Sequence, residues 1–435
     1  MEGPILGIVG ILVMFAVLFL FKIPAAFTMA LVGFLGVAYV TGFKGALGMA
    51  GPDLWNTFSN YGFTVIPMFI LVGELVHYAG YNNSLYSATY KWFGHYKGGL
   101  AITTVMACAL FSAISGSNTA TAATMSNVAI PEMKKYNYHP QLTAGSVVAG
   151  STLGVLIPPS IVLVVYGLYT GQSIGKLFFG NVIPSAILTV LIAATVVYIC
   201  SRHPDWGPKG PKSTWKERFK ILPDLIDIFI LFAIIMYALF TGVVTATEAA
   251  AASCAIGLIL CLIRRKLTWR NFLRSLDDTL RISCLVFMII AGAVIFSHFL
   301  AITRLPFEAA NIISSLKLPN WVLFWLIIFC YIIGGCVMDA LAFLLISLPI
   351  FYPIVMNMGY DPVWFGQAVC IVTTMGSLMP PVGICCYVVA GMAKDIPIGT
   401  IFRGGLYYIP SYIISIMILM LFPWATVMIL SDLVR

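Results

Sequence analysis

The chain has 435 residues, of which 60% are hydrophobic and only 9% are charged, and its mean hydropathy is +0.99. Soluble domains carry about 25% charged residues, so this composition excludes an ordinary water-soluble protein. The net charge of +8 does not indicate a nucleic-acid partner, because the basic residues lie mainly in short segments between apolar runs. Apolar runs of spanning length recur along the chain and predict an all-α polytopic membrane protein, since only helices or closed barrels satisfy their backbone in lipid.

The first half of the chain, residues 1–200, is a succession of apolar and amphipathic segments. The run at its start has no basic region before it, so we interpret it as a retained span rather than a cleaved signal. Small and polar residues around Gly116 join two helices that are short for two full crossings, which predicts a re-entrant hairpin. In chain order the predicted elements are spans at 4–22, 24–42 and 62–80, an amphipathic arm, hairpin 1 at about 99–133, a discontinuous helix at about 140–170 and a span near 181–200.

A polar segment rich in proline and glycine, residues 201–222, is the one clear linker of the chain. The second half, residues 223–435, repeats the order of the first half. Its predicted elements are spans at 224–241, 246–264 and 281–301, an arm, hairpin 2 at about 320–357, a discontinuous helix at about 362–391 and a span at 404–430. The chain therefore predicts two structural repeats joined by a linker.

Two short motifs carry this repeat most clearly. The sequences STLGVLIPP at 151–159 and TTMGSLMPP at 373–381 align without gaps, and we call the spacing that pairs position 151 with position 373 the repeat offset. A glycine followed by two prolines interrupts a helix, because proline removes a backbone donor and clashes with the preceding turn. Irregular backbone at membrane depth is tolerated only where protein or a water-filled cavity covers it. Matched interruptions in two halves therefore indicate the binding site of a transporter.

The distribution of basic residues predicts that the second repeat is upside down relative to the first. If the N-terminus is outside and each half crosses the membrane an odd number of times, 19 of the 24 lysines and arginines fall on the cytoplasmic side. This is the positive-inside pattern, and a second half in the same orientation would remove it. The sequence thus predicts two inverted-topology repeats with both termini in the periplasm.

The stretch SGSNTA at the middle of hairpin 1 predicts a cation site. The polar side chains expected to face the first interrupted helix are Ser115, Ser117, Asn118 and Thr119. Their neutral oxygens, together with carbonyls freed by the unwound backbone, suit a desolvated monovalent cation. The matching segments of the second half are 334–340 and 373–379, so two related sites are predicted. The alternative is that the small residues serve only close helix packing.

Few charged residues lie within the apolar segments, and this favours sodium over protons as the coupling ion, because a proton path needs a chain of acids or histidines. Asp339 lies at the tip of hairpin 2, where a carboxylate is costly without a function or a partner. Glu74 and Glu248 are interpreted as residues that lock the bundle. Arg304 follows the span at 281–301 and could bind a carboxylate, although an interfacial snorkelling arginine is the alternative.

Four motifs in this order, SGSNTATAATM, GVLIPPS, TGVVTATEAAA and MGSLMPPVG, resemble the large membrane subunit of a TRAP transporter over essentially the whole chain. The chain also resembles, more distantly, the divalent-anion/sodium symporters. The resemblance implies a tripartite, sodium-driven importer in a bacterial inner membrane, with a small four-span membrane subunit and a periplasmic substrate-binding protein. It implies an elevator mechanism and an organic-acid substrate such as a C4-dicarboxylate or a sialic acid. An arginine at position 304 looks most like the sialic-acid branch.

The resemblance also implies roles for individual residues. The sodium-binding residues transferred by motif are Ser115, Asn118, Gly154, Val155 and Pro158 at the first site and Gly335, Thr374, Ser377 and Met379 at the second. The residues implied to face the substrate are Ser117, Arg304 and Asp339. The halves differ at one place, because the repeat offset pairs Ser117 and Asn118 with Asp339 and Ala340. The two cation sites are therefore expected to differ in their ligands, unless Asp339 has another role.

Other classes of protein need different residues. An intramembrane enzyme needs a catalytic pair within hydrogen-bond reach, and the spans contain no histidine motif of this kind, so neither enzymatic activity nor a cofactor other than the coupling ion is expected. A channel does not need two discontinuous helices facing polar tips. A stand-alone sodium- or proton-coupled anion symporter of the same fold stays open as the alternative.

Overall fold

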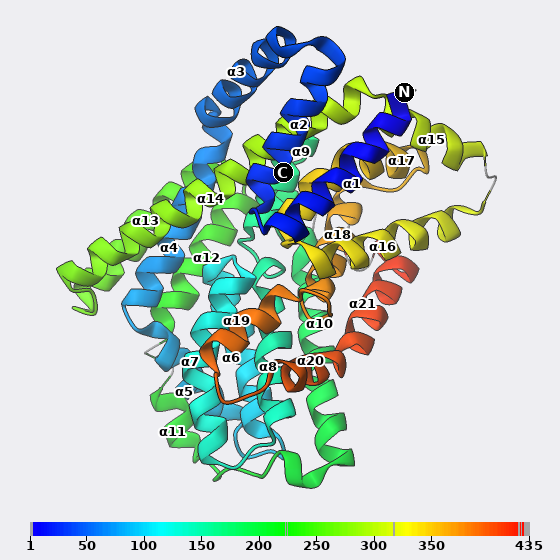
Figure 1. The fold of residues 1–435 in the computed structure, drawn as a ribbon. Helices are drawn as coiled ribbons and strands as arrows, with labels where there is room; N and C mark the ends of the chain where they lie inside the picture. Colours follow the sequence, from blue (N-terminus) through cyan, green and yellow to red (C-terminus); the bar gives the residue numbers. More distant parts are fainter. Residues whose placement is uncertain are drawn as a thin grey trace.

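The computed structural model of the protein describes residues 3–221, 223, 225–315, 318–424, 427 and 429, and every regular element among them is helical (Figure 1). Eight helices in this part of the chain are long and apolar enough to cross a membrane. They span Gly3–Phe21, Tyr61–Tyr78, Ile174–Arg202, Ala246–Ile263, Trp269–Ile302, Asn320–Val337, Ala340–Asn357 and Ile398–Leu421. The predicted all-α, multi-pass membrane protein is confirmed for the described residues.

The chain contains both long helices and shorter pieces. In the first half they are α1 (Gly3–Phe21), α2 (Ala25–Thr41), α3 (Phe43–Ser59), η1 (Tyr61–Thr64), α4 (Val65–Tyr78), α5 (Tyr81–Phe93), α6 (Gly99–Ser115), α7 (Asn118–Lys135), α8 (Pro140–Ser151), η2 (Thr152–Val155), α9 (Ile161–Thr170) and α10 (Ile174–Arg202). The linker and second half contain η3 (Pro204–Trp206), α11 (Trp215–Lys220), α12 (Ile226–Phe240), α13 (Ala246–Ile263), α14 (Trp269–Ile302), α15 (Leu305–Ser315), α16 (Asn320–Val337), α17 (Ala340–Asn357), α18 (Pro362–Gly376), α19 (Ile384–Met392), α20 (Ile398–Leu406) and α21 (Ile409–Leu421).

The order of elements recurs at a constant spacing. α7 and α17 begin at Asn118 and Ala340, and α8 and α18 begin at Pro140 and Pro362, so both pairs of helices are separated by the repeat offset. Each of α8 and α18 ends before a proline pair, and α9 and α19 begin shortly after these pairs. We call residues 152–160 the first break and residues 377–383 the second break.

Two helical stretches differ from the sequence-based expectation. No helix is predicted at 43–59, where α3 lies, and α14 begins at Trp269, before the predicted start at 281. Both stretches are amphipathic and carry charged residues, so a search for apolar runs does not detect them. They belong to the same packing unit, because Asp53 of α3 pairs with His298 of α14 at 2.6 Å between Oδ2 and Nδ1.

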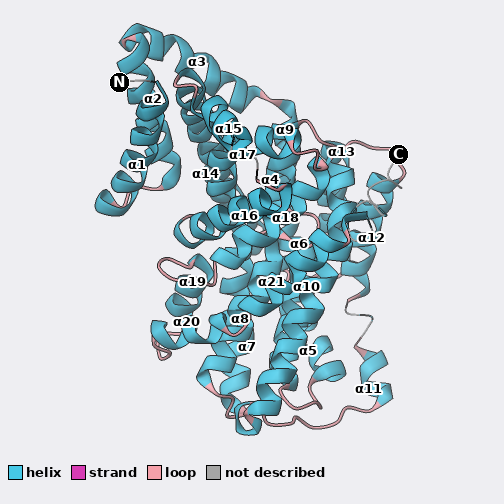
Figure 2. Cartoon of the chain, turned by 90° about the vertical axis from the view of Figure 1, so that its right-hand side faces the viewer, coloured by secondary structure: helices cyan, strands magenta, loops and turns pink. Residues whose placement is uncertain are grey.

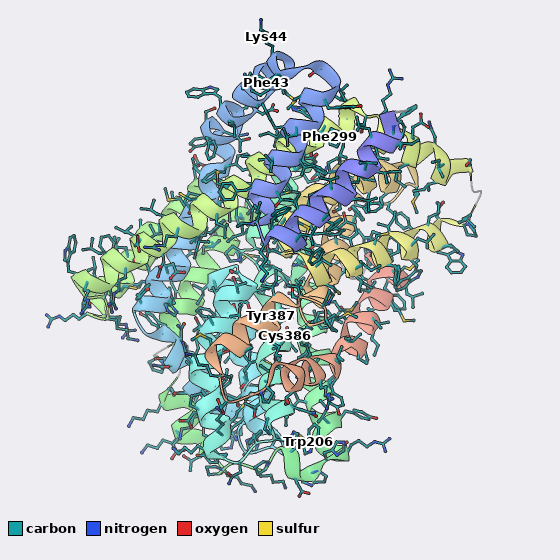
Figure 3. The ribbon with its side chains drawn as sticks, viewed as in Figure 1. Phe43, Lys44, Trp206, Phe299, Cys386 and Tyr387 are labelled. Atoms are coloured by element: carbon teal, nitrogen blue, oxygen red, sulfur yellow. The ribbon has the colours of Figure 1, made fainter. Side chains whose placement is uncertain are left out.

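The helices separate toward two ends of the molecule. Both views show α3 at one end and α11 at the other, with α5, α7 and α8 nearer to the α11 end and α14 nearer to the α3 end (Figures 1 and 2). Lys44 and Trp206 mark these two ends (Figure 3). The α11 end also carries the linker, so we call it the linker end.

Small residues allow α1 and α2 to pack closely on α14. A Cβ atom added at Gly10 or Gly36 would overlap the ring of Phe299, and one at Gly33 would lie 2.8 Å from the backbone of Phe296. Phe299 is fully buried in this contact. Glycines that admit a neighbouring helix are the usual means of helix association where lipid is the solvent.

Candidate transport site

The turn between α6 and α7, which we call the first tip (Ser115–Thr119), forms because its residues suit a sharp reversal. Gly116 has φ +58, and a Cβ there would lie only 2.9 Å from the carbonyl oxygen of Pro159. Glycine is therefore required both by the left-handed backbone and by the close approach of the first break. Ser117 then caps α7, since its Oγ accepts a hydrogen bond from the Ala120 N–H at 3.4 Å.

The first tip and the first break are joined by a direct hydrogen bond. The backbone N–H of Val155 donates to Oδ1 of Asn118 at 3.0 Å, and Asn118 is only 6% exposed. Gly154 lies against the tip so closely that a Cβ there would overlap the Ser117 carbonyl and lie 2.8 Å from the Asn118 nitrogen. The structure thus brings the predicted residues Asn118, Gly154 and Val155 together.

The remaining residues predicted for this site surround the same contact. The Ser115 hydroxyl lies 2.9 Å from Oγ1 of Thr121, which in turn donates to the Ser117 carbonyl at 2.8 Å. Pro158 is buried within the first break. Hydroxyl, amide and carbonyl oxygens therefore converge where α6, α7 and the first break meet.

The second break packs against the end of α16. A Cβ at Gly335 would lie 2.7 Å from the Thr373 carbonyl, and one at Gly376 would overlap the Gly335 backbone. The N–H groups of Val382 and Gly383 both donate to the Cys336 carbonyl, at 3.1 and 3.2 Å. α16 therefore meets α18 and the second break through backbone atoms.

The other residues predicted here lie at the end of α18. Thr374 and Ser377 are buried, and the Thr374 hydroxyl donates to the Ile371 carbonyl at 2.8 Å. The N–H of Met379 donates to the Gly376 carbonyl at 3.0 Å. All four predicted residues of the second site, Gly335, Thr374, Ser377 and Met379, thus belong to one junction.

The two junctions are not in the same register. Gly154 contacts Ser117 and Asn118, so the repeat offset would place Gly376 on Asp339 and Ala340. Gly376 instead contacts Gly335 and Cys336, one helical turn earlier. Asp339 is therefore not held at the second break, and it caps α17 by accepting a hydrogen bond from the Leu341 N–H at 3.1 Å. The sequence shows the difference in residue type, but only the packing shows the shift.

Both tips and both breaks line one cavity of about 640 Å³, which we call the central cavity. Residues of the first tip and of the second tip (Val337–Leu341) both line it. Its polar lining consists of Lys22, Ser117, Asn118, Thr119 and Asp339, and the rest is apolar, with Val155, Val382 and residues of α14 among it. A mostly apolar cavity with a few convergent polar groups is the usual form of a small-molecule site.

Arg304, the third residue predicted to face the substrate, lies elsewhere. It is exposed, has φ +57, and lines a separate cavity of about 460 Å³ together with His298 and Tyr169. Ser117 and Asp339 thus share the central cavity, whereas Arg304 does not reach it in this arrangement.

Two titratable residues beside the first tip, His77 and Asp278, were not singled out from the sequence, and they lie with Glu74, which was interpreted there as a residue that locks the bundle. Glu74, His77 and Asp278 line a cavity of about 270 Å³ that Ser115 and Ser117 also line. The ring Nδ1 of His77 lies 3.3 Å from the Thr124 hydroxyl of α7. The spacing of Glu74 and His77 on one face of α4 was a usable signal, whereas Asp278 lies in the undetected part of α14.

Glu248 does not lock the bundle, contrary to the interpretation from sequence. It is exposed and forms a capping box at the start of α13, where it accepts a hydrogen bond from the Thr245 N–H at 2.7 Å. A capping box satisfies two backbone donors of the helix's own first turn. The residue therefore stabilises the start of α13 rather than a contact between helices.

A helical membrane bundle in which two interrupted helices and two hairpin tips line one cavity is typical of a membrane transport protein. The chain matches the family "Tripartite ATP-independent periplasmic transporter, DctM component" over residues 12–425, and it belongs to that family. Proteins of this family are permeases, not enzymes, and this large subunit works with a small membrane subunit and a periplasmic binding protein.

Similar proteins support this assignment. The chain is 32% identical over 371 residues to the C4-dicarboxylate TRAP transporter large permease protein DctM of Pseudomonas aeruginosa, covering 85% of this chain and 86% of that protein. It is 30% identical over 429 residues to the sialic acid TRAP transporter large permease protein SiaM of Vibrio cholerae, covering 98% of both. The crystal structure of the Alcanivorax borkumensis YdaH transporter shares the fold at a TM-score of 0.64 and 16% identity, covering 88% of this chain and 90% of that one.

Proposed function

We propose that the chain is the large membrane subunit of a sodium-coupled transporter that imports an organic acid across a bacterial inner membrane by an elevator mechanism. A periplasmic binding protein delivers the acid, a small four-span subunit accompanies the chain, and sodium is the coupling ion, with no other cofactor. One observation carries the proposal, namely that both tips and both breaks line the central cavity. Relatives named for C4-dicarboxylates and for sialic acid support a carboxylate substrate.

Sodium is proposed to bind at the two junctions between helix ends and breaks. The proposed ligands are Ser115, Asn118, Gly154, Val155 and Pro158 at the first junction and Gly335, Thr374, Ser377 and Met379 at the second. Neutral side-chain oxygens and the carbonyls of unwound helix or of helix C-terminal ends suit a sodium ion, and the junctions bring these groups together. Because the two junctions differ by one turn, the two sodium ions are expected to have different ligand sets and affinities.

The topology is proposed to consist of two inverted repeats, residues 1–200 and 223–435, joined by a cytoplasmic linker at 201–222. The recurrence of elements at the repeat offset and the bias of basic residues support this topology. In Figures 1 and 2, α7 and α8 extend farther toward the linker end than α1 or α13 do. This arrangement supports the proposal that α7 and α8 belong to a transport unit that is displaced toward the cytoplasm. The C-terminus, predicted to be periplasmic, lies outside the described residues.

Cysteine labelling tests the orientation. Lys44→Cys, at the α3 end, is expected to react with a membrane-impermeant maleimide added to spheroplasts, because this end faces outward in the proposed topology. Lys209→Cys, in the linker, is expected to react only after the membrane is opened. The exposed thiols Cys284 and Cys330 are replaced by serine in both variants. Labelling of the linker from outside would reverse the proposed topology.

Reconstitution of the purified complex tests the function. Proteoliposomes that contain this chain and its small subunit are expected to accumulate a carboxylate only when the loaded binding protein is outside. The acid is chosen by a thermal-shift screen of the binding protein against succinate, N-acetylneuraminate and related acids, since a ligand raises apparent stability. Accumulation without the binding protein would favour the alternative, a stand-alone sodium- or proton-coupled anion symporter of the same fold.

Arg304 is proposed to meet the substrate carboxylate on the outer side, because it is an exposed residue that lines its own cavity. Arg304→Gln is expected to raise the KM of uptake by about fivefold, since an exposed charge contact contributes about 1 kcal/mol. Lys44→Gln, another exposed cation at the α3 end, is the control and should leave KM unchanged. An unchanged KM in Arg304→Gln would identify Arg304 as an interfacial snorkelling residue.

A further inference from the structure

Lys22 is the only lysine, arginine or histidine among the described residues that line the central cavity. It lies between α1 and α2, outside every motif that identifies the two junctions. It is exposed, whereas Asn118 in the same cavity is buried, so Lys22 lies toward the open side of the cavity. The cavity thus has one cationic group near its mouth and polar tips in its interior.

The backbone at Lys22 is unusual for this residue type. Its φ is +54, in the left-handed region that helix ends normally fill with glycine or asparagine. A lysine directly after the last turn of α1 can interact favourably with the helix dipole, although its Cβ makes the left-handed conformation unfavourable. Because Lys22, unlike Arg265 with its similar φ, also lines the central cavity, its position leads to the hypothesis that its side chain acts there.

The two charged residues of the cavity lining, Lys22 and Asp339, do not form an ion pair with each other. Asp339 accepts the Leu341 N–H at the start of α17, where the helix dipole stabilises a negative charge. Among the described residues, no carboxylate lies within ion-pair distance of Lys22. An unpaired ammonium in the same cavity as the Ser117 and Thr119 hydroxyls is a combination of groups that can bind a carboxylate through charge-assisted hydrogen bonds.

We propose that Lys22 binds a carboxylate group of the transported acid while the central cavity is open on its side, and that it thereby selects anions over neutral solutes. The inference rests on the proposed function, because it assumes that an organic acid enters this cavity. It assigns the anion contact of the central cavity to the α1–α2 turn, which belongs neither to the hairpins nor to the breaks. Arg304 lines the other cavity, so its proposed contact with the substrate belongs to a different step of transport.

The first test removes the charge without disturbing the turn. Lys22→Asn keeps a residue suited to the left-handed region, and Lys22→Arg keeps the charge. Arg265→Asn is the matched control, because Arg265 is also an exposed basic residue with φ +51 but does not line the cavity. In proteoliposomes supplied with loaded binding protein, Lys22→Asn is expected to lower uptake of succinate or N-acetylneuraminate about tenfold, the usual effect of a lost charge-assisted hydrogen bond. Lys22→Arg and Arg265→Asn should stay near the wild-type rate.

The second test restores the charge on protein that has already folded. Lys22→Cys, with Cys284 and Cys330 replaced by serine, is treated with a cationic aminoethyl or an anionic sulfonatoethyl methanethiosulfonate. The cationic reagent is expected to restore uptake, and the anionic reagent is expected to leave it low. Equal uptake by Lys22→Asn and wild type, or equal effects of both reagents, would overturn the role of Lys22. Wild-type complex that transports neither acid would instead overturn the proposed function, and with it this inference.

Discussion

Gly154→Ala is expected to abolish most sodium-driven uptake, because the added Cβ cannot be accommodated. It would overlap the Ser117 carbonyl and crowd the Asn118 nitrogen, both of which belong to the backbone and cannot move as a side chain can. Overpacking of this kind costs about 1–3 kcal/mol. If the tip separates from the break to relieve it, a loss of about 2 kcal/mol corresponds to a sodium affinity lower by about 30-fold.

The control for this variant is Gly391→Ala in α19, where an added Cβ meets nothing within 4 Å. Alanine there is expected to leave uptake unchanged and to stabilise the helix by up to about 1 kcal/mol. Gly376→Ala at the second break should behave like Gly154→Ala, because its Cβ would overlap the Gly335 backbone. Sodium dependence of the uptake rate and thermal unfolding are measured for all three. A Gly154→Ala protein with wild-type sodium dependence would show that the junction does not hold the coupling ion.

Asn118→Ala is expected to show the second large effect. It removes the acceptor for the Val155 N–H and leaves that buried donor unpaired, which costs about 1–3 kcal/mol. It also removes a proposed sodium ligand. The half-saturating sodium concentration should therefore rise by about tenfold or more, and the melting temperature should fall.

Asn118→Asp separates the structural effect from the effect on the cation. Its carboxylate oxygen can accept the Val155 N–H as Asn118 does, so the fold should be retained, while an anionic ligand should keep sodium binding strong. Asn83→Ala, at an exposed position of α5, is the neutral control. Normal sodium dependence in Asn118→Ala would remove Asn118 from the cation site and leave it a purely structural role.

The breaks and tips could be predicted from sequence because proline and glycine act locally. The pairs at 158–159 and 380–381 interrupt any helix in which they occur, and their constant spacing reveals the repeat. α3 and the start of α14 could not be found in this way, because they are amphipathic and their charged residues interrupt the apolar runs on which the prediction of spans depends.

Features that depend on tertiary packing could not be predicted from the sequence either. The shift of one turn between the two junctions depends on which segment packs against Gly376. In the structure this is Gly335, whereas the sequence also allowed the Asp339 region. The separation of Arg304 from the central cavity has the same origin. The presence of Lys22 in the central cavity also depends on tertiary packing, because Lys22 lies far from both tips in the sequence.

The central claim is that the two junctions bind sodium and that this binding drives uptake. The most direct measurement is the initial rate of acid uptake into proteoliposomes, with binding protein outside, under an inward sodium gradient, a pH gradient or neither. We expect uptake with the sodium gradient, saturating with sodium concentration, and only background uptake with the pH gradient alone. Uptake driven by the pH gradient in sodium-free buffer would contradict the claim.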